Sequence, residues 1–292
     1  MLQGGLSPVH PGRSEKSFLE VVTIQGGNAL LPEKLAQSLG EKVHLNRPLI
    51  AVSKEGAGYS LLFQNGEQVK GDILVLAIPC STYRNISFEK GLIPQETLAA
   101  IENVQYGTNA KIVIPFSQIP SKRTTFINDR AGAFFNPDRT ILTLYYTGEA
   151  GRFSADDLLE MYRQDYPMIE MGLGSLCPPL STPVFARDAS MTSYEEPVAY
   201  SWPNDLYIQG SYSYIAPGQE LLFTATEEKA GEKVKTLFTP IDQTLYFAGE
   251  HASILAEGVG TMEAACESGE RTVRMIEKGT AYVCQGARNE SS

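Results

Sequence analysis

The residues best suited to hold a ligand lie in two neighbouring segments near the end of the chain. The segment LYFAGEH, residues 245–251, is an apolar run that ends in a glycine and a carboxylate, Glu250. Residues 258–271, GVGTMEAACESGER, follow with a turn at Gly260 and a helical pattern. A helix N-terminus offers unpaired N–H groups and the positive end of the helix dipole. Glu250 is therefore a candidate hydrogen-bond acceptor beside such an end, and an ordinary loop carboxylate is the alternative.

A second set of candidates is basic and aromatic. Lys111 stands in an apolar strand-like run, where a solvent-facing lysine is the simplest interpretation. Trp202, the only tryptophan, lies close to Tyr212 and Tyr214 in a stretch rich in proline, serine and tyrosine. This composition favours loops and short strands around a cavity. Simple packing of the cavity wall explains the same aromatic residues.

These candidates need a scaffold of alternating strands and helices. Residues 72–79, DILVLAIP, are apolar on both faces, which is typical of a strand in a parallel sheet covered by helices. In an open α/β sheet the ligand lies beyond the carboxyl ends of the strands, so Glu250 and Gly260 are expected to face it. Strands are predicted at residues 18–24, 43–52, 59–63, 71–79, 110–116, 140–146 and 244–248, and helices at 31–39, 94–103, 154–166 and 261–278.

Composition narrows the class of function. The chain has 292 residues, and 34 acidic against 24 basic side chains give a formal net charge of -10, which disfavours nucleic acid and anionic membranes. The longest apolar run, residues 73–78, is far shorter than the roughly 20 residues that span a bilayer, so a cytoplasmic protein is predicted. Four cysteines without a CxxC pair and three histidines support neither a metal site nor a disulfide framework.

Several segments, taken in order, resemble the flavin-dependent amine oxidases, which include monoamine, polyamine and L-amino-acid oxidases. Residues 246–251 and 260–271 resemble the C-terminal FAD-binding signature of that family, and residues 25–32, QGGNALLP, resemble its Gly-Gly helix entry. Residues 45–49 with 74–79 resemble the strands that flank the adenine. Residues 106–111 and 202–214 resemble the segment of the flavin-side lysine and the aromatic wall.

The resemblance implies an α/β fold: an incomplete, Rossmann-like FAD-binding domain with an inserted α+β substrate domain built on a mixed sheet. The GxGxxG turn that opens such enzymes has no match in the sequence, since residues 56–61 and 172–177 each carry only two of the three glycines. The implied organisation is a mobile leader (1–17), the middle part of the FAD domain (18–93), a substrate domain (94–240), the C-terminal part of the FAD domain (241–280) and a tail (281–292).

The same resemblance implies roles in FAD binding. Glu250 would accept hydrogen bonds from FAD hydroxyls, and Leu49 would offer backbone contacts to the adenine. After the Gly260 turn, the N–H groups of Thr261 and Met262 would face the pyrimidine oxygens of the flavin. Ser211 stands near the position where monoamine oxidases carry a flavin-linking cysteine, so the FAD is expected to be non-covalent.

It also implies roles in catalysis. Lys111 would hold a water near flavin N5, and Trp202, Tyr212 and Tyr214 would form a cage that guides a neutral amine. Thr261 occupies the place of a cage tyrosine of the monoamine oxidases, so their substrate preference is not carried over.

The function implied is FAD-dependent oxidation of an amine or amino acid to an imine, with oxygen as acceptor and hydrogen peroxide as product. One alternative is a non-catalytic half that needs an N-terminal FAD-binding subunit, because residues 72–79 would otherwise leave an unpaired apolar edge. Another is a related flavoenzyme acting on a non-amine substrate, such as a porphyrinogen or a carotenoid precursor.

Overall fold

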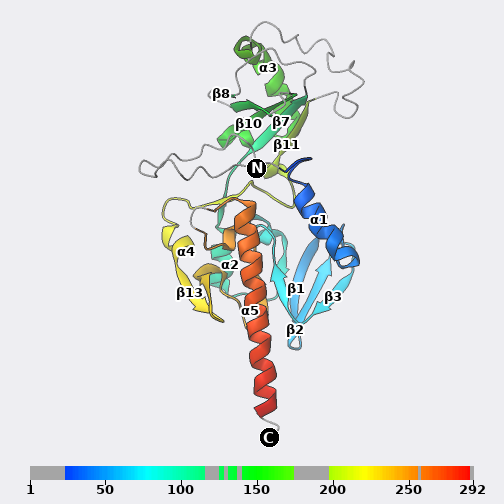
Figure 1. Cartoon of the computed structure of the whole chain (residues 1–292), viewed down its shortest axis with the longest axis vertical. Helices are drawn as coiled ribbons and strands as arrows, with labels where there is room; N and C mark the ends of the chain where they lie inside the picture. The colour runs from blue at the N-terminus through cyan, green and yellow to red at the C-terminus, as the bar shows by residue number, and fades with distance from the viewer. Residues whose placement is uncertain are drawn as a thin grey trace.

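A computed structural model describes residues 24–115, 125–127, 131–136, 140–173, 197–255 and 258–289. The leader and the strand predicted at residues 18–24 lie almost wholly outside these residues. The described residues form two lobes, one above the other in Figure 1, with a long C-terminal helix running down the lower lobe. Mixed helices and strands make this an α/β fold, as predicted.

The lower lobe begins with helix α1 and a three-stranded antiparallel meander that α1 flanks in Figure 1. Strand β5 adds to β1 in parallel, which gives the sheet order β3-β2-β1-β5. The strand expected from residue 43 begins only at Leu49, because Asn46 has a positive φ of 59° and Pro48 has no N–H for a ladder. The bounds are α1 Leu30–Leu39, η1 Gly40–Lys42, β1 Leu49–Glu55, β2 Gly58–Phe63, β3 Gln68–Gly71 and β5 Ser87–Phe88.

A parallel pair of strands, β4 (Leu74–Leu76) and β15 (Leu245–Phe247), lies at the centre of this lobe. Val75 pairs with Tyr246, so the two side chains share one face of the pair. Tyr246 is buried against helix α5 (Met262–Asn289), but Val75 and Ile73 are 39% and 38% exposed. Helices were expected to cover both faces of this strand. The face of β4 that carries Ile73 and Val75 is instead exposed, because α5 lies over β15 and no described element covers β4 on that side.

The rest of the lower lobe completes its core and carries the connections. Its elements are η2 Cys80–Asn85, α2 Gln95–Glu102, α4 Glu220–Thr224, β13 Thr226–Lys229, β14 Glu232–Lys235, η6 Thr236–Phe238 and η7 Glu250–Ala252. The hairpin of β13 and β14 packs against α5. Helix α5 continues to Asn289, so residues 281–289, expected as a tail, form its last turns. Within the described chain, no helix is both long and apolar enough to cross a membrane.

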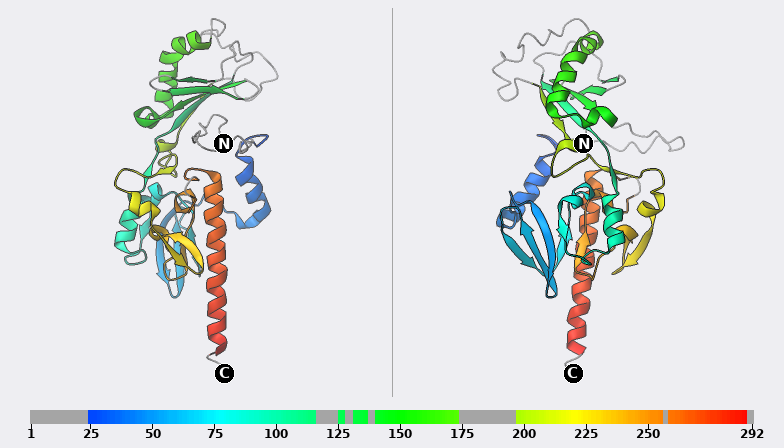
Figure 2. Two further views of the ribbon diagram at one scale, coloured as in Figure 1. Left: turned by 60° about the vertical axis from the view of Figure 1, so that its left-hand side comes forward. Right: turned by 180° about the vertical axis from the view of Figure 1, so that it is seen from behind.

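The upper lobe is a five-stranded sheet with helix α3 (Ala155–Leu173) on one face (Figures 1 and 2). Its strand order is β11-β7-β10-β9-β8, with antiparallel pairs throughout. Alternate residues of β7 and β10, such as Ile112 and Leu144, are buried under Leu158 and Tyr162 of α3. The bounds are β7 Ala110–Pro115, β8 Thr125–Ile127, β9 Ala131–Phe135, β10 Ile141–Tyr146, η3 Gly148–Arg152 and β11 Val198–Ser201.

The two lobes are joined by chain segments that run close together. Strand β6 (Gln105–Tyr106) leads directly into β7, and it pairs with β12 (Ser213–Tyr214) on the return path. The 3-10 turn η5 (Trp202–Asn204) follows β11 on the same path. Figure 2 shows these connections between the lobes. The junction therefore brings the segment of Lys111 next to the segment of Trp202 and Tyr212.

Candidate functional site

A cavity of about 340 Å³ lies at the junction of the lobes, on the face of the upper sheet away from α3. In the sheet register, Lys111 of β7 lies opposite Tyr145 of β10 on one side and Tyr200 of β11 on the other. Its Nζ is 5.4 Å from the ring centroid of Tyr145 and 5.2 Å from that of Trp202. The cavity is lined by Asn28, Asn109, Lys111, Tyr145, Trp202, Ser211 and Tyr212.

The ammonium group of Lys111 lies against aromatic rings rather than beside a carboxylate. No salt bridge to Lys111 is present among the described residues, and two cation–π contacts take the place of an ion partner. Burial lowers the pKa of the Lys111 ammonium. Burial, together with the neighbouring phenol of Tyr212, raises the pKa of Tyr145. Lys111 is thus a partly buried cation inside the cavity and not a solvent-facing residue.

Sequence reasoning missed Asn109 and Tyr145 as members of this cavity, and it considered Ser211 only for the mode of flavin attachment. Asn109 is only 5% exposed, and its side-chain amide interacts with the Tyr145 hydroxyl, which lowers the pKa of that phenol; the buried Oγ of Ser211 has no hydrogen-bond partner among the described residues. Tyr145 follows the alternating pattern of β10 and faces Lys111 across the ladder. The alternation of residues 140–146 was the one available signal, because it places Tyr145 on the face opposite the buried Leu144 and Tyr146.

Glu250 lies at the start of turn η7, three residues after the end of strand β15, and its carboxylate joins two other segments. Its Oε1 accepts the N–H of Ser213 at 2.8 Å. Its Oε2 accepts the Ser213 hydroxyl at 2.9 Å and the N–H of Gly260 at 3.0 Å. Ser213 belongs to the path from the upper lobe, and Gly260 precedes α5. One carboxylate therefore holds together two segments that are distant in the sequence.

The turn before α5 needs glycine at Gly260. Its φ is +80°, and a Cβ at this position would lie 3.0 Å from the ring of Tyr212. Thr261 caps the helix, since its Oγ1 accepts the N–H of Ala264 at 3.2 Å. The N–H of Thr261 is donated to the carbonyl of Gly258, and Met262 begins the helix partly exposed. The turn thus places the Glu250 loop against the same Tyr212 that lines the cavity.

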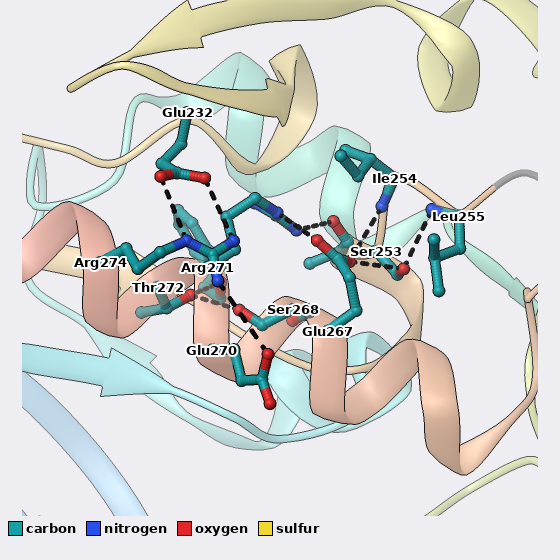
Figure 3. A network of polar contacts seen from close by, with 12 residues as sticks. Glu232, Ser253, Ile254, Leu255, Glu267, Ser268, Glu270, Arg271, Thr272 and Arg274 are labelled. Atoms are coloured by element: carbon teal, nitrogen blue, oxygen red, sulfur yellow. Dashed lines mark hydrogen bonds and ion pairs between the residues drawn. The ribbon is translucent and has the colours of Figure 1, made fainter.

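Two buried cationic side chains donate hydrogen bonds to the backbone of the η7 turn. Lys235 Nζ donates to the carbonyl of His251 at 2.7 Å, and Arg271 donates to the carbonyl of Ala252 at 2.8 Å. These carbonyls belong to the two residues that follow Glu250. Arg271 is 3% exposed and also pairs with Glu267 at 2.8 Å (Figure 3). The direction of the Glu250 side chain therefore depends on two charged groups outside the cavity.

Further contacts from α5 complete this support. Glu267 accepts the hydroxyl of Ser253 at 2.6 Å, and Figure 3 shows it between Arg271 and the 253–255 segment. Ser268 Oγ accepts the N–H of Gly249 at 2.8 Å. On the outer side of the helix, Arg274 pairs with Glu232 of strand β14 (Figure 3). The inner contacts hold the loop, whereas the outer one joins the helix to the hairpin.

The buried imidazole of His251 should make the stability of the folded chain sensitive to acid. It is buried beside Phe238, and burial lowers its pKa from 6.5 to about 3. The unfolded chain takes up this proton below about pH 6.5 and the folded chain does not. The free energy of unfolding should therefore fall as the pH drops, by up to about 1.4 kcal/mol per pH unit. We expect His251→Leu to remove this slope between roughly pH 6.5 and 5 in urea unfolding titrations.

The pH range of this test matters because carboxylates change the free energy of unfolding at lower pH. The pKa of Glu232 is lowered to about 2 by Arg274 and Lys278, and interactions with Arg271 and Ser253 lower that of Glu267. Such groups contribute stability above their unfolded pKa and lose it only as the pH falls through about 4.5 and below. An unchanged slope in His251→Leu above pH 5 would show that His251 is not the titrating group.

Leu49 lies in a different place from the Lys111 cavity. It lines a second, largely apolar cavity of about 750 Å³ formed by residues 44–50, 64, 78, 82, 85, 86, 206 and 207. Tyr214 is exposed and is not among the residues that line the first cavity. The structure thus brings together Lys111, Trp202 and Tyr212, and joins them through Gly260 to Glu250. Leu49 and Tyr214 stand apart from this group.

Comparison with known sequences defines the class of protein. Residues 10–276 match the family described as flavin containing amine oxidoreductase. This match covers most of the chain, and the α/β fold and the motif order agree with it. The chain belongs to the flavin-containing amine oxidoreductase family.

Individual relatives are similar to this chain over most of its length, at low sequence identity. An L-amino-acid oxidase of Gloydius halys is 25% identical over 91% of this chain and 51% of its own length. Human amine oxidase [flavin-containing] B is 26% identical over 91% of this chain and 48% of its own length. The chain therefore spans about half the length of the relatives it matches.

Solved structures show the same fold. A redesigned putrescine oxidase matches with a TM-score of 0.63 at 19% identity, over 86% of this chain and 53% of that one. Cyclohexylamine oxidase from Brevibacterium oxydans matches with a TM-score of 0.61 at 16% identity, with the same coverage. At these identities the likeness concerns the fold alone.

Proposed function

We propose that this chain contributes the substrate cavity and part of the FAD site of an enzyme that oxidises an amine or amino acid to an imine, with oxygen as acceptor and hydrogen peroxide as product. The observation that carries this proposal is that the Lys111 cavity and the Glu250 loop lie next to each other. The Lys111 cavity, walled by Trp202 and Tyr212, adjoins the Glu250 loop through Gly260. A substrate and a cofactor would thus meet at the lobe junction.

The Glu250 loop fits an FAD hydroxyl in its donor and acceptor chemistry. An ionised carboxylate has about four lone-pair sites. Three are used by Ser213 and Gly260, which leaves capacity for one further donor. The glycine turn brings backbone close to the cavity without side chains, as a flat cofactor ring requires. Thr261 and Met262, at the start of α5, would favour negative charge on the flavin.

The apolar cavity at Leu49 supports the proposed adenine contact. The Leu49 backbone lies at the start of strand β1, and the cavity is lined by apolar residues such as Ile78 and Leu206 together with polar ones such as Arg47 and Gln64. A planar aromatic ring is a suitable occupant of an apolar slot with a few backbone polar groups. Ser211 supports non-covalent binding, because a hydroxyl at this position would not form the thioether that a cysteine forms.

Lys111 and the aromatic residues would order the substrate and the water around it. The flavin, when bound, supplies the acceptor for the hydride equivalent from the C–H next to nitrogen. Trp202 and Tyr212 offer flat apolar surfaces to the substrate, whereas Tyr214 lies outside the cavity. Lys111 would hold a water or another oxygen ligand close to the reacting centre, and its cation disfavours a protonated amine nearby.

The test is reconstitution of the purified chain with FAD. We expect a yellow complex after gel filtration, bleaching on anaerobic addition of an amine from a panel, and release of ammonia and peroxide in air. Bleaching by a porphyrinogen or a carotenoid precursor, but by no amine, would favour the alternative substrate class. A chain that stays colourless at high FAD concentration refutes independent cofactor binding.

A second candidate function rests on the exposed edge of β4. Ile73 and Val75 are partly exposed on a strand that pairs on only one side among the described elements. Such an apolar edge is a template for strand addition. In this alternative, the chain is a subunit that acquires FAD only with a second polypeptide supplying the GxGxxG unit. A colourless chain that becomes yellow on mixing with such a polypeptide supports it.

A further inference from the structure

Lys235 is a buried cation without an ion pair. It is the last residue of strand β14 and is only 7% exposed. Its Nζ lies 5.4 Å from the ring centroid of Phe223 and donates to the carbonyl of His251 at 2.7 Å. Among the described residues, no salt bridge joins Lys235 to a carboxylate, whereas the other buried cation, Arg271, has one. A buried charge is costly unless an opposite charge offsets it, so we looked for the group that does so.

Glu250 carries the opposite charge and likewise has no salt bridge within the described chain. Its carboxylate accepts hydrogen bonds only from uncharged donors, which belong to Ser213 and Gly260. The carbonyl that Lys235 binds belongs to the next residue, His251. Burial lowers the pKa of the Lys235 ammonium, and among the charges around it Glu250 raises that pKa the most. The two unpaired charges therefore attract each other across the η7 turn.

Arg271, the second cation at this turn, is arranged differently. It pairs with Glu267 at 2.8 Å and donates to a carbonyl of the turn. Its charge is balanced by that pair and does not depend on Glu250. Towards Lys235 it acts as a like charge that lowers the pKa, whereas Cys80 and Glu267 raise it. The two cations thus bind neighbouring carbonyls, but only Lys235 is left to offset the charge of Glu250.

We propose that Lys235 is a positioning residue whose charge holds the Glu250 carboxylate in place, whereas Arg271 supports the turn through its hydrogen bond alone. The consequence for a cofactor rests on the proposed function, because a fixed, ionised Glu250 is what an FAD hydroxyl would meet. The charge interaction itself does not, since both residues belong to this chain and attract each other without any ligand. A neutral side chain at position 235 would leave Glu250 with uncharged donors only.

A double-mutant cycle in the chain without cofactor measures this interaction. Lys235→Gln keeps a hydrogen-bond donor but removes the charge, and Glu250→Gln removes the opposite charge. We expect each variant to lower the midpoint of urea unfolding. The double variant should lose clearly less than the sum of the two losses, because both substitutions delete the same attraction. Additive losses would overturn the proposal. Should Lys235→Gln not fold, the double variant decides: recovery of folding supports the proposal, and continued unfolding contradicts it.

Two control cycles separate the charge from damage to the turn. Ser213→Ala removes a hydrogen bond of the same loop but keeps the carboxylate, so its loss should add to that of Lys235→Gln. Lys233→Gln removes an exposed charge from the same strand and should change the midpoint little, alone or with Glu250→Gln. Lys235→Arg keeps the charge and should retain more stability than Lys235→Gln. If Ser213→Ala is as non-additive with Lys235→Gln as Glu250→Gln is, the charge is not responsible.

FAD affinity tells failure of this inference apart from failure of the proposed function. Where the chain binds FAD, Lys235→Gln should weaken binding about tenfold, and Lys233→Gln should leave it unchanged. A chain that shows the coupling between Lys235 and Glu250 but never binds FAD keeps the charge interaction and loses the proposed cofactor role. A chain that binds FAD equally well as Lys235→Gln, with additive losses in the cycle, keeps the proposed function and loses the role of Lys235.

Discussion

Replacing Arg271 by methionine is expected to lower the free energy of unfolding by about 3 to 5 kcal/mol. The guanidinium is almost fully buried, pairs with Glu267 and donates to the carbonyl of Ala252. Methionine retains much of the volume but leaves Glu267 and the carbonyl without this partner. Urea unfolding followed by circular dichroism measures the change.

The matched control is Arg274→Met, on the same helix. Arg274 pairs with Glu232 but is 46% exposed in its side chain, and exposed pairs contribute about 0 to 1 kcal/mol. The same substitution should therefore have a small effect three residues away. If both variants lose the same stability, the burial of Arg271 is not the reason, and helix α5 as a whole is responsible.

Replacing Glu250 by glutamine is expected to have the second largest effect. A carboxylate that accepts three protein hydrogen bonds becomes an amide, whose NH₂ group cannot accept them. Hydrogen bonds to charged groups contribute roughly 1.5 to 3 kcal/mol each, and the amide keeps part of them. We expect a loss of about 3 kcal/mol in unfolding free energy, measured by urea titration, and weaker FAD binding where the chain binds FAD.

Ser213→Ala separates these two consequences. It removes the hydroxyl bond to Glu250 but keeps the carboxylate and the backbone bond, so it should cost about 1.5 kcal/mol, the lower end for one bond to a charged group. FAD affinity, read from quenching of flavin fluorescence, should be unchanged in this variant and reduced about tenfold or more in Glu250→Gln. Equal losses of affinity in both variants would mean that Glu250 acts only through Ser213.

Secondary structure was predictable where the signal is local. The run LYFAGE predicts a strand ending in a glycine turn, and the structure has β15 ending at Phe247 with a turn at Gly249. Helix α5 begins at Met262, next to the predicted start, because Thr261 is a good N-cap. The hairpin of β13 and β14 was missed, because its charged residues, such as Glu228 and Lys233, hide the strand alternation.

The family, the α/β fold and the identity of most candidate residues follow from sequence alone, because each depends on short-range patterns such as an apolar run, a glycine turn or a helix cap. The meeting of Lys111, Asn109 and Ser211 in one cavity depends on tertiary structure. So do the three bonds to Glu250 and the buried ion pair of Arg271 with Glu267 beneath the loop. The physical reason is that strand register and lobe packing decide which distant side chains become buried together. Burial is what lowers the pKa values of Lys111 and His251.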